Sequence, residues 1–128
     1  MTPEELLNEW GAGWATQDED ERRRRFEACA AEDVEFLPPD DRPAFRGRDA
    51  LIAHVAEYTA PWPAGTVARI DGPVDTHHGW SRALIRWTFP AADAVGCEVM
   101  QVTDGRITRM VVFADEYVQT QSPREDRR

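Results

Sequence analysis

The chain has 128 residues, of which 41% are hydrophobic and 30% are charged, a balance typical of a single folded domain. Its formal net charge of −9 argues against nucleic acid or an anionic membrane as a partner. No apolar run is long enough to span a bilayer, and no secretory signal is recognisable. The two cysteines, Cys29 and Cys97, match no metal-binding or redox spacing, so we expect free thiols in a cytoplasmic protein.

The first half of the sequence predicts helices. Thr2 and Glu5 have the spacing of a capping box, and Trp10 and Trp14 follow on one helix face. Four arginines at positions 22–25 follow four acidic residues, an order that complements the helix dipole and indicates a solvated helix face. The expected elements, in chain order, are a helix from residue 3, a helix over 19–31, a short strand over 34–37, a helix over 48–59, an interrupted strand over 66–76 and three strands over 83–117.

The last three strands are expected to form an antiparallel meander, with turns near Ala92 and at Asp104-Gly105. A first turn centred on Ala92 places Arg86 opposite Glu98 as a cross-strand ion pair. A three-residue second loop over 104–106, with Gly105 left-handed, places Glu98 opposite Val112. A two-residue turn at this point is the alternative, and it would exchange the faces of the last strand.

This register predicts two faces, of which the first lines a cavity and the second is apolar and covered by a second copy of the chain. The first face comprises Arg82, Leu84, Arg86, Thr88, Glu98, Met100, Val102, Met110, Val112 and Ala114. The second comprises Ala83, Ile85, Trp87, Phe89, Val99, Val111 and Phe113, of which Ile85, Trp87, Val99, Val111 and Phe113 are expected at the dimer interface.

Helices followed by a long antiparallel sheet indicate an α+β fold, in which a curved sheet with helices over its concave face makes a cone around a pocket. With this layout, the segments 31–36, 45–51, 86–88 and 102–107 resemble the SnoaL-like branch of the nuclear transport factor two-like superfamily. The resemblance implies one domain over residues 1–118, and the polar residues 119–128 are expected to be a disordered tail. The superfamily contains isomerases, cyclases, dehydratases, epoxide hydrolases and non-catalytic binding proteins, so the resemblance alone does not assign a function.

Within the superfamily, the segments 48–50 and 99–108 most resemble limonene epoxide hydrolase. That family's catalytic arginine falls on Arg86, but its two aspartates fall on Thr88 and Val112, so its triad is absent. Its tyrosine and asparagine positions fall near Val34 and Phe36. The resemblance therefore does not imply epoxide hydrolysis by that mechanism.

The candidate catalytic residues are Glu98, Arg86 and His54. Burial raises the pKa of a carboxylate while a nearby arginine lowers it, so Glu98 is either an acid–base group or one partner of a structural ion pair, unless its face is misjudged. The candidate substrate-binding residues are Trp10, Trp14, Tyr58, Thr88, Met100, Met110 and Val112. His77 and His78 fall at a turn without a third ligand, so no metal site is expected.

These residues favour a cofactor-independent enzyme that moves protons on an apolar small molecule, by isomerisation, cyclisation, dehydration or hydration. A non-catalytic binding protein and a dimeric accessory module with the same fold are the alternatives. The three are distinguished by whether a carboxylate or histidine is reachable from the cavity, since an enzyme of this kind needs one.

Overall fold

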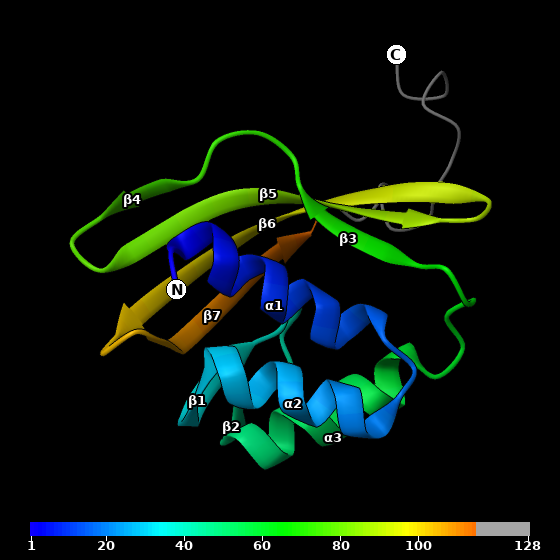
Figure 1. Cartoon of the computed structure of the whole chain (residues 1–128), viewed down its shortest axis with the longest axis horizontal. Helices are drawn as coiled ribbons and strands as arrows, with labels where there is room; N and C mark the ends of the chain where they lie inside the picture. Colours follow the sequence, from blue (N-terminus) through cyan, green and yellow to red (C-terminus); the bar gives the residue numbers. More distant parts are fainter. Residues whose placement is uncertain (115–128) are drawn as a thin grey trace.

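The computed structural model describes residues 1–114, and the tail expected over 119–128 lies outside these described residues. In the described part of the chain, three helices pack against one seven-stranded sheet (Figure 1). The elements are α1 (Pro3–Ala15), α2 (Glu19–Cys29), β1 (Ala30–Leu37), β2 (Phe45–Arg46), α3 (Arg48–Thr59), β3 (Val67–Ile70), β4 (Asp75–His77), β5 (Trp80–Phe89), β6 (Ala92–Thr103) and β7 (Arg106–Ala114).

The sheet is curved, mixed and open, which confirms the expected α+β cone architecture. Its strand order is β2-β1-β7-β6-β5-β3, with β4 paired to β5 outside this path, and only the β1–β7 pairing is parallel. Figure 1 shows α1 running across the sheet, with α2 and α3 on the side of α1 away from β5. The helices therefore cover one face of the sheet and leave the other face of β5, β6 and β7 without a covering element in residues 1–114.

Sequence-local signals explain where the helices begin. The Thr2 side chain accepts a hydrogen bond from the Glu5 amide, and the Glu5 side chain accepts one from the Thr2 amide, which confirms the expected capping box. Asp18 caps α2 in the same way, through the Glu21 amide. Helix α2 ends at Cys29, two residues earlier than expected, because Ala30 already belongs to β1.

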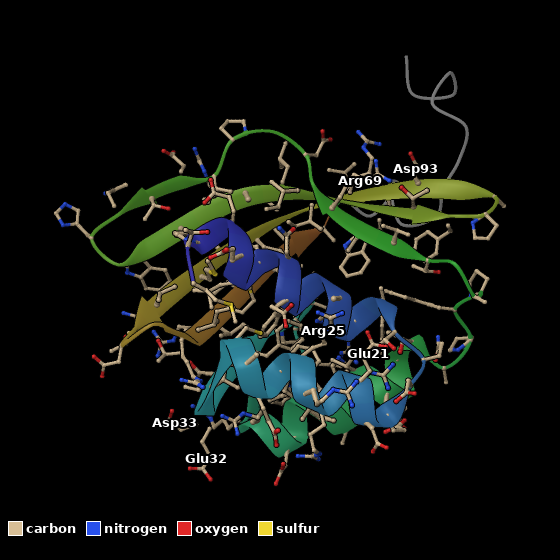
Figure 2. The ribbon with its side chains drawn as sticks, in the orientation of Figure 1. Glu21, Arg25, Glu32, Asp33, Arg69 and Asp93 are labelled. Atoms are coloured by element: carbon tan, nitrogen blue, oxygen red, sulfur yellow. The ribbon has the colours of Figure 1, made fainter. Side chains whose placement is uncertain are left out.

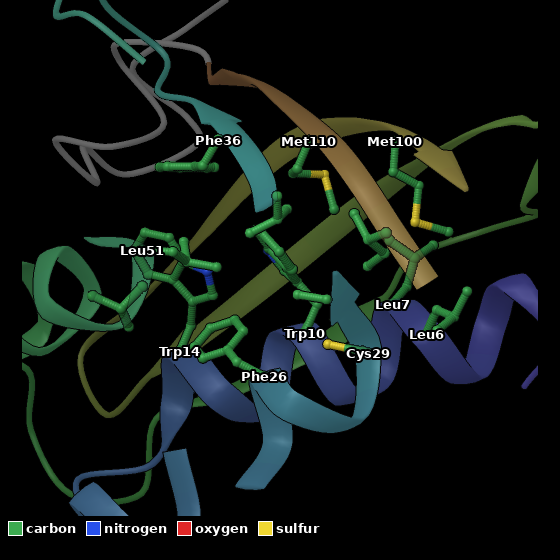
Figure 3. Packing of buried hydrophobic residues seen from close by; sticks show 14 of the residues in the cluster. Leu6, Leu7, Trp10, Trp14, Phe26, Cys29, Phe36, Leu51, Met100 and Met110 are labelled. Atoms are coloured by element: carbon green, nitrogen blue, oxygen red, sulfur yellow. The ribbon is translucent and has the colours of Figure 1, made fainter. Parts of the chain in front are cut away.

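Aromatic and sulfur-containing side chains fill the space between the helices and the sheet (Figure 3). Trp10 is fully buried and makes an edge-to-face contact with Phe26, with ring centroids 5.3 Å apart. Met100 and Met110, opposed on β6 and β7, are also fully buried. These residues form the core beside the cavity described below.

The first strand pair of the meander has a different register from the one expected. The turn is the two-residue Pro90-Ala91, with Phe89 opposite Ala92, and Glu98 therefore opposes Ala83. Arg86 opposes Val95, so the expected Arg86–Glu98 ion pair is wrong. The observed pairing differs from the expected one by three residues. Because this number is odd, every side chain of β5 points to the face of the sheet opposite to the one expected.

The burial of apolar surface explains this reversal. The observed register directs Ala83, Ile85, Trp87 and Phe89 toward the helices, and it directs Arg82, Leu84, Arg86 and Thr88 away from them. A register with two arginines facing the core would leave their charges poorly solvated, at a cost of several kcal/mol. The expected faces were therefore wrong for β5 and right for β6 and β7.

The second hairpin has the expected register near Glu98, but its turn differs from the one expected. The turn is the two-residue Asp104-Gly105, with φ of 53° and 77°, a type I′ geometry that accommodates glycine well. The expected three-residue loop is therefore wrong. A bulge beside Gln101 leaves Thr108 as the extra residue, and beyond it Glu98 opposes Val112 as expected.

Candidate functional site

A cavity of about 200 Å³ lies between the helices and the covered face of the sheet. Its residues come from α1, β1, α3, the loops after β1 and α3, and the strands β5, β6 and β7. They are Trp14, Phe36, Pro39, Arg42, His54, Tyr58, Trp62, Trp87, Phe89, Ala94, Val95, Gly96, Glu98, Val112 and Ala114.

Small residues on the sheet make room for this cavity. Gly96 opposes Ala114 across β6 and β7, and Ala94 opposes Trp87 across β5 and β6. All four residues line the cavity. The small side chains of Ala94, Gly96 and Ala114 form its floor, and the indole of Trp87 lies next to this floor. The resulting floor is suited to a flat ligand.

Aromatic rings form the opposite wall, and Trp62 is central to it. Its ring centroid lies 5.4 Å from that of Trp87 and 5.2 Å from that of Phe89, both edge to face. It also lies 6.4 Å from Trp14 and 6.1 Å from Tyr58. Trp62 therefore joins the helical side of the cavity to β5 through aromatic contacts.

Glu98 is the one buried carboxyl group that lines the cavity in residues 1–114. It is 4% exposed, and it forms no hydrogen bond or ion pair with another described residue. Burial raises the pKa of Glu98 from 4.5 to about 8, because the apolar surroundings disfavour the ionised form. At neutral pH this side chain is mainly a neutral acid that can donate a hydrogen bond into the cavity.

His54 projects from α3 into the same cavity and is 8% exposed. Its imidazole stacks on Phe45 with centroids 4.0 Å apart, and it meets the edge of Trp14 at 6.0 Å. Burial lowers the pKa of His54, and the charge of Arg42 adds to this effect. The imidazole is therefore neutral at pH 7 and able to accept a proton.

Arg86 lies on the opposite face of the sheet from the cavity. Its guanidinium donates to Asp71 at 2.9 Å and to Asp93 at 3.3 Å, and these two carboxylates raise its pKa. Asp93 projects from the same uncovered face in Figure 2. Thr88 opposes Asp93 and shares that face, so neither Arg86 nor Thr88 reaches the cavity.

The remaining candidates divide between the cavity wall and the core. Trp14, Tyr58 and Val112 line the cavity, and Tyr58 is 46% exposed at its edge. Trp10, Met100 and Met110 do not line it, because they are fully buried in the core. The structure thus brings Glu98 and His54 to one cavity. Arg86 and Thr88, which were expected beside Glu98, lie on the other face of the sheet.

Ten of the fifteen lining residues were not among the candidates, and these include Arg42, Trp62, Trp87 and Phe89. Trp62 lies in the loop after α3, and a tryptophan in a loop needs an apolar surface to cover it. Trp87 and Phe89 were assigned to the outer face by the incorrect turn. The alternation of arginine and apolar residues along β5 was the signal that could have corrected this assignment.

Within residues 1–114, no three or more His, Cys, Asp or Glu side chains gather closely enough to hold a metal ion. His77 and His78 lie at the turn after β4, where His78 has a φ of 55°, and their rings contact each other. Cys29 is a buried free thiol, and its burial raises the pKa to about 12, while Cys97 is a half-buried free thiol.

Comparison with known sequences agrees with this architecture, because the model of the SnoaL-like domain matches residues 8–110. The chain belongs to the SnoaL-like family. A search of curated proteins finds no match. None of the described helices of this SnoaL-like protein is long and apolar enough to cross a membrane.

Solved structures of the same fold include a proposed isomerase of the SnoaL-like family from Agrobacterium tumefaciens. It is 25% identical, with a TM-score of 0.74 over 86% of this chain and 94% of that one. A Catenulispora acidiphila protein with a ketosteroid isomerase-like fold, in complex with trimethylamine, is 15% identical, with a TM-score of 0.71 over 95% of this chain and 94% of that one. A proposed SnoaL-like polyketide cyclase from Jannaschia sp. CCS1 is 18% identical, with a TM-score of 0.69 over 94% of both chains.

Proposed function

We propose that this SnoaL-like protein is a cofactor-independent enzyme that moves protons on a small, apolar carbonyl compound. The observation that carries the proposal is the buried Glu98, which lines the cavity without a partner among the described residues. His54 lines the same cavity, and burial shifts its pKa in the opposite sense. Two titratable groups whose surroundings move their pKa values apart are typical of an acid–base pair.

The proposed reaction uses both groups in their resting protonation states. The carbonyl oxygen of the substrate accepts a hydrogen bond from the Glu98 carboxyl group, which polarises the carbonyl. His54 removes a proton from the adjacent carbon, and the electron pair of the broken C–H bond moves through carbon to the oxygen. Glu98 stabilises the enolate through its hydrogen bond, keeping its own proton, and protonated His54 returns the proton to another carbon as the carbonyl re-forms, which completes an isomerisation. Expulsion of a leaving group or ring closure from the same enolate gives dehydration or cyclisation.

Hydrogen exchange tests this proposal without knowledge of the natural substrate. With 2-tetralone as a probe in deuterated water, we expect the protein to accelerate deuterium incorporation next to the carbonyl, followed by NMR. His54→Gln and Glu98→Leu are expected to slow the catalysed exchange by about 100-fold or more, the contribution usual for an acid–base group. His77→Gln, at the remote turn, is the matched control and is expected to leave the rate unchanged.

Two results would contradict this proposal. The first is exchange no faster than in buffer, and the second is an accelerated rate that survives both cavity variants. Folding of each variant is checked by its thermal unfolding transition, so that a lost rate is assigned to the missing group and not to a lost cavity.

A non-catalytic receptor for organic ammonium ions is the second candidate. The similar fold from Catenulispora acidiphila was solved with trimethylamine, and an aromatic wall beside a carboxyl group is a setting that binds such cations. This candidate requires ionised Glu98, so its affinity rises with pH through the pKa of that residue. The proposed enzyme requires the neutral acid, so its affinity for a ketone falls over the same range.

A further inference from the structure

The cavity offers a ligand no free charge from the described residues. Arg42 is the charged side chain at its edge, and its guanidinium and backbone amide both bond to Asp40. The Arg42 Nε lies 3.1 and 3.0 Å from the two carboxylate oxygens, so this pair is already satisfied. A charged ligand that entered the cavity would lose its hydration without an opposite charge to replace it.

The shape of the cavity selects flat molecules. One side is the small-residue floor of Ala94, Gly96 and Ala114, and the other is the aromatic wall around Trp62 and Trp87. Offset stacking and edge contacts with aromatic rings are most extensive for a planar ring system. A carbonyl oxygen on such a ring can accept a hydrogen bond from the buried carboxyl group of Glu98.

The size of the cavity is set at its aromatic end. A volume of about 200 Å³ is below the range of about 300–1,000 Å³ that is usual for drug-sized ligands. Trp62 closes this end through its contacts with Trp87 and Phe89. Its backbone amide donates to the Thr59 carbonyl at 2.9 Å, and the Gln17 amide nitrogen donates to the carbonyls of Thr59 and Trp62 at 2.9 and 3.4 Å. The loop that carries Trp62 is therefore tied to α3 and to the end of α1.

We propose that the cavity takes an uncharged, flat ketone or enone of one or two rings, with its oxygen on Glu98, and that Trp62 sets the length of ligand admitted. This inference rests on the proposed function, since both place an acceptor oxygen at Glu98. It goes further in naming the charge and size of the substrate and the residue that determines its length.

Four ligands that share one bicyclic skeleton test whether the ligand must be uncharged and whether it needs a carbonyl oxygen. They are 2-tetralone, tetralin, the anion tetralin-2-carboxylate and the protonated 2-aminotetralin, titrated by calorimetry at about pH 6 and about pH 9.5. At the lower pH, 2-tetralone is expected to bind at least about tenfold more tightly than each of the other three. Its advantage over tetralin is expected to disappear at the higher pH, where Glu98 is ionised. The other titratable groups that line the cavity are His54 and Tyr58 from α3 and Arg42 from the loop before β2.

Two substitutions assign this pH dependence to Glu98. An amide donates a hydrogen bond at any pH, so Glu98→Gln is expected to keep the advantage of 2-tetralone at both pH values. Glu98→Leu removes the donor and is expected to abolish the advantage at both. Equal affinity for 2-tetralone and tetralin in the wild type would overturn the inference. Tightest binding of the amine, with affinity rising with pH, would overturn it in favour of the ammonium receptor.

The role of Trp62 is tested with a ketone of three fused rings. Wild-type protein is expected to bind it at least about tenfold more weakly than 2-tetralone, and Trp62→Ala is expected to remove this difference. Trp80→Ala, which removes an indole from β5 outside the cavity, is the matched control and is expected to behave as wild type. Equal binding of both ketones by the wild type, or an unchanged difference in Trp62→Ala, would overturn the length limit.

The outcomes separate this inference from the proposed function. If 2-tetralone binds as expected but its hydrogens do not exchange, the ligand class stands and the enzymatic proposal fails. If the hydrogens exchange while charged and larger analogues bind equally well, the enzymatic proposal stands and the ligand class fails.

Discussion

Glu98 is a carboxylic acid in surroundings that stabilise its uncharged form. It has apolar neighbours on adjacent strands in Ala83 and Val112, and no cation among the described residues compensates its burial. Arg86, three residue pairs away along the hairpin, has the opposite surroundings, because two carboxylates pair with its guanidinium and it is partly exposed. The two side chains differ because they project from opposite faces of one sheet.

Stability should therefore depend on pH through Glu98. Its pKa is raised from 4.5 to about 8 in the folded state, so the folded protein holds this proton more tightly than the unfolded chain. The stabilisation is complete below about pH 4.5 and is lost as pH rises to about 8. Relative to Glu98→Gln, the free energy of unfolding of the wild type is expected to fall by up to about 4–5 kcal/mol across this range.

Urea unfolding of both proteins at several pH values measures this difference. A gap that stays constant from pH 4.5 to pH 8 would show that Glu98 titrates normally. A uniform loss of stability in Glu98→Gln would instead indicate a structural ion pair, the alternative that the observed register already disfavours because Arg86 is on the other face.

At this scale, the sequence could identify Glu98 as unusual because a charge within an apolar strand needs an explanation. It could also place His54 on the inner side of its helix from periodicity. The sequence could not place Arg86 on the correct face of the sheet, because that placement depends on the register between β5 and β6. An error of three residues in this register put Arg86 on the wrong face. The observed register, which reverses the faces of β5, leaves Glu98 without a partner among residues 1–114.

Among the elements, α2 is anchored by a buried arginine. Arg22 is 1% exposed, and its Nε donates to the Gly13 carbonyl at 3.1 Å. Its Nη2 donates to the Thr16 carbonyl and to the Thr59 hydroxyl, the latter at 3.2 Å. One guanidinium thus joins α2 to the end of α1 and to α3, and the expected solvated face of 22–25 was wrong at this residue. Figure 2 shows Glu21 and Arg25 on the same helix, where Arg25 pairs with Glu21 at 3.2 Å.

Loss of Arg22 should destabilise the helical layer. Arg22→Met is expected to lower the free energy of unfolding by about 3 kcal/mol, because it leaves three buried acceptors without their donor. Arg24→Met, at an exposed position of the same helix, is the control and is expected to change it by less than about 0.5 kcal/mol. Equal stability of the two variants in chemical unfolding would show that the Arg22 hydrogen bonds contribute nothing.

The strands show what turn signals can predict. Asp104-Gly105 correctly indicated a hairpin, and the residues opposed across β6 and β7 near Glu98 were predicted correctly. Neither the type I′ turn nor the compensating bulge at Thr108 was predicted, since a bulge has no local sequence signature here. At the first hairpin, Pro90 fills a turn position suited to proline, but the predicted turn was centred on Ala92, too far along the chain.

At the scale of the molecule, the uncovered face of the sheet carries an apolar band between two charged clusters. Leu84, Cys97 and Phe113 are opposed in one row across β5, β6 and β7, and Leu84 and Phe113 are 47% and 61% exposed. On one side, Arg86 pairs with Asp71 and Asp93, and Arg69 of β3 opposes Arg86 on the same face, so the charges of this cluster balance. On the other side, the Glu35 carboxylate is paired with both Arg46 and Arg109, leaving a net positive charge.

We predict that a second copy of the chain covers this band. A two-fold axis roughly parallel to the central strands would pack the apolar bands of two copies face to face. The interface then includes Val99, Val111 and Phe113 as expected, with Leu84 and Cys97 in place of Ile85 and Trp87, which face the helices. Sedimentation is expected to give twice the chain mass of 14.6 kDa at micromolar concentration.

Phe113→Glu is expected to produce the monomer, because it places a charge in the centre of the apolar band. Ala53→Glu, on the exposed side of α3, is the matched control and is expected to remain dimeric. A wild-type monomer, or a dimer that survives the Phe113 substitution, would contradict this interface.

The most direct test of the account is the protonation state of Glu98. Protein labelled with carbon-13 at the glutamate side-chain carboxyl carbons can be titrated by NMR, with the Glu98 signal assigned by its loss in Glu98→Gln. We predict that this signal titrates with a pKa near 8, well above those of the exposed glutamates, so that the cavity holds a neutral acid at neutral pH. A pKa for Glu98 near the ordinary 4.5 would contradict the account, because an ionised carboxylate could neither donate to a carbonyl oxygen nor favour an uncharged ligand.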